Sequence, residues 1–151
     1  MAVGGPAFET MLYEANGTWG TEAEVLGSVP ATHTLVDWSA IDPAKVVRGT
    51  NQPKAPSKLT AVDDGIRVEL TLIDPIGWDT YAFPVASAPP AGDNVLRFRG
   101  AALGMANAVT IEVREKDGSR WLAVAPLQPE EREVGIHRDA FVYWRDSLSS
   151  G

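Results

Sequence analysis

The chain has 151 residues, 44% of them hydrophobic, which is enough for one globular domain with its own core. Its formal net charge of −7 argues against nucleic acid as the main partner, because phosphate contacts need clustered lysine and arginine. The absence of cysteine excludes disulfides and thiolate zinc sites.

No window of the sequence has the apolar length of a membrane span, so no membrane partner is expected. The opening Met1–Pro6 lacks the charged and apolar regions of a signal peptide, and the ending Ser147–Gly151 is equally loop-like. We therefore interpret residues 1–151 as a single domain excised from a larger protein.

The first half of the chain predicts few elements. Residues 34–38 are compatible with a short strand, and Asp42-Pro43 with a turn or the first turn of a short helix. Residues 51–56 contain two prolines and predict an extended loop, because proline disfavours helix before it. No long stretch has a helical period.

Strands become clearer from Gly65 onward. Residues 65–72 alternate apolar and polar side chains, which predicts a strand with one face toward the core. The residues expected on that core face are Ile66, Val68, Leu70 and Leu72. Further strands are predicted at residues 79–85, 95–99, 133–137 and 141–144.

Residues 109–126 predict a hairpin. Asp117-Gly118 lies between two alternating runs, and this dipeptide is typical of a type I′ turn, which needs positive φ at both central residues. The predicted register pairs Val113 with Leu122 and Ile111 with Val124 on one face, and Arg114 with Trp121 and Glu112 with Ala123 on the other. Short strands separated by eleven prolines and fourteen glycines predict an all-β fold, an antiparallel β-sandwich or jelly roll.

Four passages carry a further pattern: Phe8–Thr10, Asn94–Gly100, Ile111–Leu127 and Glu131–Phe141. Together they resemble the galactose-binding-like β-sandwich of carbohydrate-binding modules, which are accessory domains of polysaccharide-degrading enzymes. The chain departs from that pattern at Ala7, where Asp is usual, and at Arg132, near a usual Trp. The family closes with a further strand, whereas here Phe141 is followed by a run into Arg145-Asp146-Ser147.

The resemblance implies a secreted, non-catalytic module that binds a polysaccharide or oligosaccharide and is covalently linked to a catalytic domain. It also implies that Glu9 helps to hold a structural calcium ion, which takes six to eight oxygen ligands. The alternative for Glu9 is a solvated strand residue.

Aromatic side chains flanked by polar groups are candidates for stacking on sugar rings. Trp121 is one, because the predicted register places it on the polar face of the hairpin, and Trp78 with Tyr81 is another. The polar partners expected nearby are Arg97, Arg99, Glu69, Glu112 and Arg114. The alternative for Trp121 is packing under a loop, with Arg114 as a cross-strand cation–π partner. Trp78 could instead plug one end of the sandwich. Arg97 and Arg99 could instead form ion pairs across the sheet with Glu69 and Glu112. Trp38 and Trp144 are expected in the core.

Two other functions stay open from the sequence: a structural β-sandwich that packs against a catalytic domain, and a small glycan-active hydrolase or lyase. The chain has no nucleophile elbow or phosphate loop, and His33 and His137 lack metal-ligand spacing. We therefore expect a binding module and not an enzyme.

Overall fold

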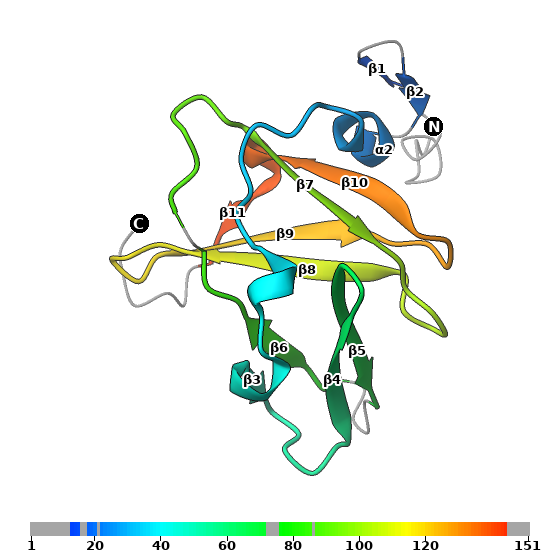
Figure 1. The fold of residues 1–151 in the computed structure, drawn as a ribbon, viewed down its shortest axis with the longest axis vertical. Coiled ribbons are helices and arrows are strands. Elements are labelled where there is room, and N and C mark those ends of the chain that lie inside the picture. The colour runs from blue at the N-terminus through cyan, green and yellow to red at the C-terminus, as the bar shows by residue number, and fades with distance from the viewer. Residues whose placement is uncertain (1–12, 16–17, 21, 72–75, 86, 145–151) are drawn as a thin grey trace, which may run out of the picture. The chain divides into compact units, whose positions relative to one another are not determined.

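The computed structural model of the chain describes residues 13–15, 18–20, 22–71, 76–85 and 87–144. Within these ranges the protein consists mostly of antiparallel β-strands, with one short α-helix and three 3-10 turns (Figure 1). The all-β prediction is therefore confirmed, and no sheet of the described residues closes into a barrel.

The chain forms two compact units. Unit 1 comprises the described residues of 1–32 and 92–151, and unit 2 comprises those of 33–91. The elements of unit 1 are β1 (Tyr13–Ala15), β2 (Thr18–Gly20), α2 (Glu22–Gly27), β7 (Val95–Gly100), β8 (Ala108–Arg114), β9 (Arg120–Pro126), β10 (Arg132–His137), η3 (Arg138–Ala140) and β11 (Val142–Tyr143). Those of unit 2 are η1 (Trp38–Ala40), η2 (Pro43–Lys45), β3 (Val47–Thr50), β4 (Ser57–Val62), β5 (Gly65–Leu70) and β6 (Asp79–Ala82).

Unit 1 is built around two sheets whose apolar faces meet. One sheet pairs β7 with β10, and the other has the order β11–β9–β8. Phe98 lies opposite Val134 and Leu96 opposite Ile136, so the inward direction predicted for Phe98 and Leu96 is confirmed. The core cluster consists of Ala123, Ala125, Val134 and Ile136, with Phe98, Ile111, Leu127 and Phe141 packed against it.

The helix α2 covers the face of the β7–β10 sheet that points away from the core cluster (Figure 1). The backbones of α2 and β10 lie very close together there. A Cβ built on Gly135 would lie 2.3 Å from the carbonyl carbon of Leu26. A Cβ built on Gly27 would lie 2.6 Å from the carbonyl oxygen of Glu133. The two glycines thus permit the helix and strand backbones to touch, since neither contact leaves room for a side chain.

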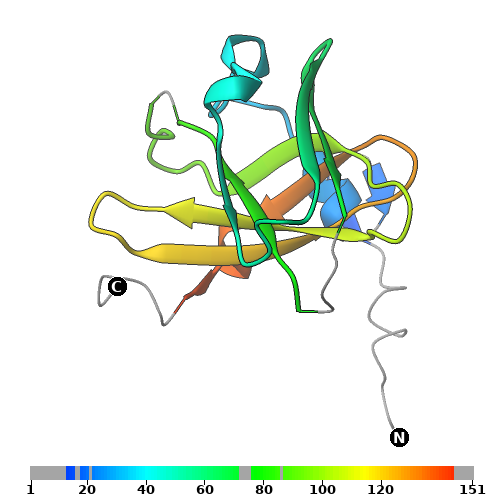
Figure 2. The same ribbon diagram turned by 90° about the horizontal axis from the view of Figure 1, so that it is seen from below.

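The hairpin of β8 and β9 forms where the sequence predicts it, but the predicted register is wrong by one residue (Figure 2). Val113 lies opposite Trp121, and Glu112 lies opposite Leu122. The loop has three residues, because Glu115 N donates to Ser119 O at 2.9 Å and Gly118 N donates to Glu115 O at 3.1 Å. Only Gly118 needs positive φ in such a loop, and its φ is 95°. An Asp-Gly pair suits both loop lengths, and this one is the longer.

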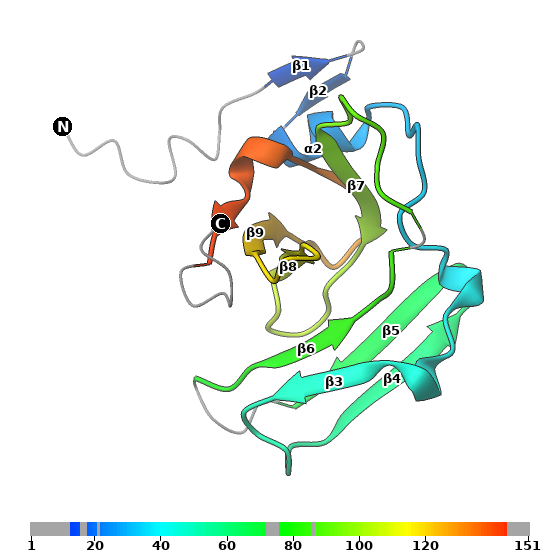
Figure 3. The same cartoon turned by 90° about the vertical axis from the view of Figure 1, so that its left-hand side faces the viewer.

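Unit 2 consists of two antiparallel ribbons, β3–β6 and β4–β5, which lie next to each other (Figure 3). Val62 lies opposite Gly65, so Asp63-Asp64 forms the tight turn between β4 and β5. The hydroxyls of Ser57 on β4 and Tyr81 on β6 are hydrogen-bonded and join the two ribbons.

The region before β3 is organised by side-chain caps. The strand predicted at residues 34–38 is absent, because Asp37 accepts a hydrogen bond from Ser39 N at 3.0 Å and caps a 3-10 turn instead. Asp42 does the same for the next turn through Ala44 N at 3.1 Å, which confirms the turn predicted at Asp42-Pro43. Strands β3 and β4 and the helix α2 were not predicted.

The strand predicted at residues 65–72 is confirmed as β5, but its burial is not. Val68 and Leu70 are largely exposed, and Leu72 lies outside the described residues. A two-stranded ribbon covers little of its own apolar face, so alternation alone overestimates the burial here.

Candidate functional site

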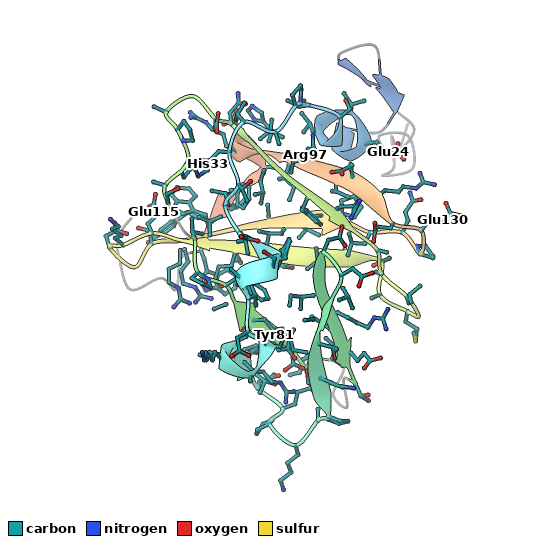
Figure 4. The ribbon with its side chains drawn as sticks, viewed as in Figure 1. Glu24, His33, Tyr81, Arg97, Glu115 and Glu130 are labelled. Atoms are coloured by element: carbon teal, nitrogen blue, oxygen red, sulfur yellow. The ribbon has the colours of Figure 1, made fainter. Side chains whose placement is uncertain are left out.

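The residues proposed as a site divide between the two units. Figure 4 labels one of each, Arg97 in unit 1 and Tyr81 in unit 2. Trp121, Arg97, Arg99, Glu112 and Arg114 belong to unit 1, whereas Trp78, Tyr81 and Glu69 belong to unit 2. Glu9 lies outside the described residues. Each unit therefore carries its own set of candidate residues.

Trp121 lies on the inner face of its sheet, with Val113 and Tyr143 opposite it on the neighbouring strands. Its ring meets that of Tyr143 edge to face, with centroids 5.4 Å apart. Its Nε1 donates to a carboxylate oxygen of Glu115 at 3.2 Å, at the hairpin end (Figure 4). The register shift thus separates Trp121 from Glu112 and Arg114, which lie on the other face.

Glu112 is the centre of a charged cluster on that outer face. Arg120 donates to both of its carboxylate oxygens, at 2.8 and 2.7 Å, and Arg114 donates to one of them at 3.0 Å. The hydrogen bonds from Arg120 are the main reason why the pKa of Glu112 lies below its ordinary value, and the bond from Arg114 acts in the same direction. Burial of Glu112 opposes this shift.

Arg97 and Arg99 both point away from the core, as predicted, but their environments differ. Arg97 donates to the carbonyl oxygen of Val29 at 2.6 Å and pairs with Glu133 at 3.3 Å, which ties the segment after α2 to the sheet. Arg99 pairs with Glu131 at 2.8 Å. Both arginines form ion pairs, as the alternative predicts, but the predicted partners Glu69 and Glu112 are wrong and the actual ones are Glu133 and Glu131.

In unit 2, Trp78 is a half-exposed indole in a firmly held loop. Its side chain and backbone together are 49% exposed. Its backbone N–H donates to Asn51 Oδ1 at 2.9 Å, and its carbonyl accepts from Thr50 Oγ1 at 3.0 Å. Asn51 Nδ2 also donates to the carbonyl of Ile76 at 3.2 Å. Side chains of the opposite strand end therefore immobilise the backbone that presents the ring.

On the face of the β3–β6 ribbon that Trp78 shares, the paired positions carry no charged side chain. A Cβ built on Gly49 would lie 3.6 Å from Cζ3 of Trp78, so the ring contacts β3 where a side chain is missing. Thr80 lies opposite Gly49, and Ala82 lies opposite Val47 on the same face. We call these residues the tryptophan strip: Val47, Gly49, Trp78, Thr80 and Ala82.

Tyr81 lies on the other face of β6, so it does not form a wall with Trp78. It is opposite Arg48, and its hydroxyl bonds to Ser57. On this inner face Arg48 pairs with Asp79, whose side chain is completely buried, and donates to the carbonyl of Ala55 at 3.1 Å. Glu69 lies on the other ribbon, opposite Lys58.

The sequence does not predict the hydrogen bonds that Thr50 and Asn51 make to the backbone of Trp78, and the core position predicted for Trp144 is wrong. Asn51 and Thr50 precede a proline-containing loop, and only the pairing of β3 with β6 brings them to Trp78. Trp144 was expected in the core but is 40% exposed. Its alternation with the half-buried Tyr143 is the signal that places it on the outer face of the sheet.

Metal ligands, cavities and membrane-spanning helices are the remaining features of the described residues. No three or more His, Asp or Glu side chains among them are grouped so that they could hold a metal ion. A hollow of about 30 Å³ in unit 1 is large enough to hold a water molecule. It is lined by Glu24, Gly100, Pro126, Gln128, Arg132, Glu133 and Val134. No helix within the described ranges is long and apolar enough to cross a membrane.

Comparison of the chain with protein-family models, with curated proteins and with solved structures gave no match.

Proposed function

We propose that the protein is a non-catalytic carbohydrate-binding module that holds a neutral polysaccharide on the tryptophan strip of unit 2. The observation that carries the proposal is Trp78, a half-exposed indole whose backbone is fixed by Thr50 and Asn51. A sugar ring has apolar C–H faces that stack on an indole. A platform that is ordered before binding loses little conformational entropy when the sugar arrives.

The chemistry of the strip favours an uncharged ligand. Thr80 is exposed and supplies a hydroxyl beside the ring, while Val47 and Ala82 extend the surface without charge. Asp79 follows Trp78 in the sequence, but its carboxylate is buried on the opposite face of the ribbon, where it pairs with Arg48. Ring stacking and a few hydrogen bonds to sugar hydroxyls would give a modest affinity, roughly micromolar to millimolar.

The proposal is tested by affinity gel electrophoresis of the full chain in gels that contain a neutral glucan, xylan or mannan. Trp78→Ala should lower retardation, because loss of one stacking platform costs on the order of 1–3 kcal/mol by analogy with aromatic stacking elsewhere. Trp78→Phe should restore part of the binding, because it keeps an aromatic face.

Ile76→Ala is the matched control, since Ile76 is an exposed apolar side chain of the same loop. It should bind as the wild type does. Absence of retardation in every neutral polysaccharide, or equal binding by Trp78→Ala and the wild type, would favour a structural β-sandwich without a ligand of its own.

The resemblance adds the remaining parts of the proposal. The module would be secreted as part of a larger protein, attached to a catalytic domain, and would hold a structural calcium through Glu9. Melting curves recorded in EDTA and in millimolar calcium test the last point, because an ion that binds only the folded state raises the melting temperature.

A further inference from the structure

We propose that the outer face of the β11–β9–β8 sheet in unit 1 is a second glycan surface, which takes acidic oligosaccharides of at least two sugar units. The inference rests on the proposal that the protein binds carbohydrate, and it adds a separate site with a different ligand class. We call this surface the arginine face. Its residues are Glu112, Arg114, Arg120, Leu122, Val142 and Trp144.

The register of the sheet places an aromatic ring and two guanidinium groups in one row. Arg114 lies opposite Arg120, and Trp144 N donates to the carbonyl of Arg120 at 2.8 Å. Residues opposite each other on paired strands share a face, so Arg114, Arg120 and Trp144 all lie on the outer side. The next row on this side is Glu112, Leu122 and Val142.

The two arginines have different tasks within this row. Arg120 binds both oxygens of Glu112 and is held in place by them. Arg114 is 67% exposed in its side chain and makes a single bond to Glu112, which is already bound by Arg120. A guanidinium has five N–H donors in a planar fork that matches a carboxylate, so Arg114 can bind an acidic group on a ligand. Glu112 would keep its partner Arg120 when Arg114 turns to the ligand.

The distance along the row sets the size of the ligand. Arg114 and Trp144 are separated by two strand spacings, about 10 Å. Arg120, bound to Glu112, lies between them, so a ligand that contacts both extends along the row, with one sugar ring on Trp144 and the acidic group on a following sugar. This charged face also contrasts with the uncharged tryptophan strip, so the two surfaces should select different polysaccharides.

The acidic group can be a uronate carboxylate or a sulfate ester, because both are planar or trigonal arrays of oxygens that accept from guanidinium. The test uses affinity electrophoresis of the full chain in gels that contain a polyuronate, a sulfated galactan or an uncharged glucan. Preference for the first gel identifies the carboxylate, and preference for the second identifies the sulfate.

Arg114→Gln should raise the dissociation constant that is derived from retardation in the acidic gel roughly tenfold or more. This is the effect expected for the loss of a hydrogen bond between charged groups. Trp144→Phe should retain much of the binding and Trp144→Ala should lose it. Arg138→Ala is the charge-matched control, because Arg138 is an equally exposed arginine of unit 1 outside this face. Arg138→Ala should bind as the wild type does.

Two results would overturn the inference: no retardation of the wild type in either acidic gel, or an equal loss in Arg114→Gln and Arg138→Ala, which would show attraction by overall charge. Trp144 continues the pairing of β11 with β9, so Trp144→Ala can weaken the sheet as well as remove the ring. Arg114→Gln is therefore the deciding variant. Trp78→Ala separates the two proposals, since it should affect only the neutral gel. Loss of neutral binding alone then concerns the tryptophan strip, and loss of acidic binding alone concerns the arginine face.

Discussion

At the scale of residues, Arg48 and Asp79 form an ion pair in unit 2 in which the carboxylate is shielded from solvent. The side chain of Asp79 is completely buried and bound to Arg48, which also donates to the carbonyl of the buried Ala55. A buried carboxylate persists as an ion only when it is paired. Hydrogen bonding by Arg48 accordingly holds the pKa of Asp79 below its ordinary value, although burial acts in the opposite direction.

This pair predicts a loss of stability in acid. Because the pKa of Asp79 is lower in the folded than in the unfolded protein, its stabilisation is complete above the unfolded value of about 3.9. The stabilisation is lost as the pH falls through the lower, folded value. Thermal melts from pH 7 to pH 3 should therefore show a smaller acid-induced decrease in Asp79→Asn than in the wild type, from a melting temperature already lowered by several degrees at pH 7.

Asp42→Asn is the control for this experiment, because Asp42 is an exposed carboxylate that pairs with Lys45 at the surface. Its pH profile should follow that of the wild type. An Asp79→Asn profile parallel to the wild type would show that the ion pair does not link stability to pH.

At the scale of elements, the contact between α2 and β10 determines how the outer face of the β7–β10 sheet is used. Gly27 and Gly135 bring the two backbones together, and Arg97 ties the following carbonyl of Val29 to the sheet. The polar face of β7 is therefore partly a packing surface. This accounts for the role of Arg97 as an anchor within the fold.

We predict that Gly135→Ala is destabilising, because its new Cβ would lie 2.3 Å from backbone that has no rotamer to change. Overpacking of this kind costs about 1–3 kcal/mol or more. Gly65→Ala is the matched control, since its Cβ would lie 3.8 Å from the nearest atom, a side-chain methyl. Urea unfolding measures both variants, and equal midpoints would contradict a close contact of α2 with β10.

At the scale of the whole molecule, the two units differ in their apolar cores. The buried apolar residues of the described part of unit 1 are Val25, Ala102, Ala123, Ala125, Val134 and Ile136. In the described part of unit 2 the buried apolar residue is Ala55. Polar contacts there come from the Arg48–Asp79 pair and from the caps at Asp37 and Asp42. Burial of apolar surface is the main driving force of folding, so unit 2 has the smaller share of it.

Hydrogen exchange should reveal this difference. Amides of β7, β8, β9 and β10 should be more protected than those of β3, β4, β5 and β6, because local opening is easier where few apolar contacts must be broken. Mass spectrometry of peptides from each strand measures the protection. Equal protection in both units would show that they unfold together in one cooperative step.

The sequence by itself determined the all-β class, the β5 strand, the hairpin position, the turn at Asp42-Pro43 and the inward direction of Leu96 and Phe98. These follow from alternation and from turn and cap residues, which act over a few neighbouring positions. Trp78 was also a candidate for stacking on a sugar ring, whereas its exposure is decided by the structure.

Only the tertiary structure decided the hairpin register, which sets the face of Trp121, and the pairing of β11 with β9, which sets the face of Trp144. Asp-Gly suits a loop of two or three residues, and one added loop residue exchanges every side chain between the two faces. Likewise, Thr50 and Asn51 reach Trp78 only because β3 pairs with β6 across nearly thirty residues of chain. Local patterns specify strands and turns, whereas the composition of a surface depends on which distant strands pair, and in which register.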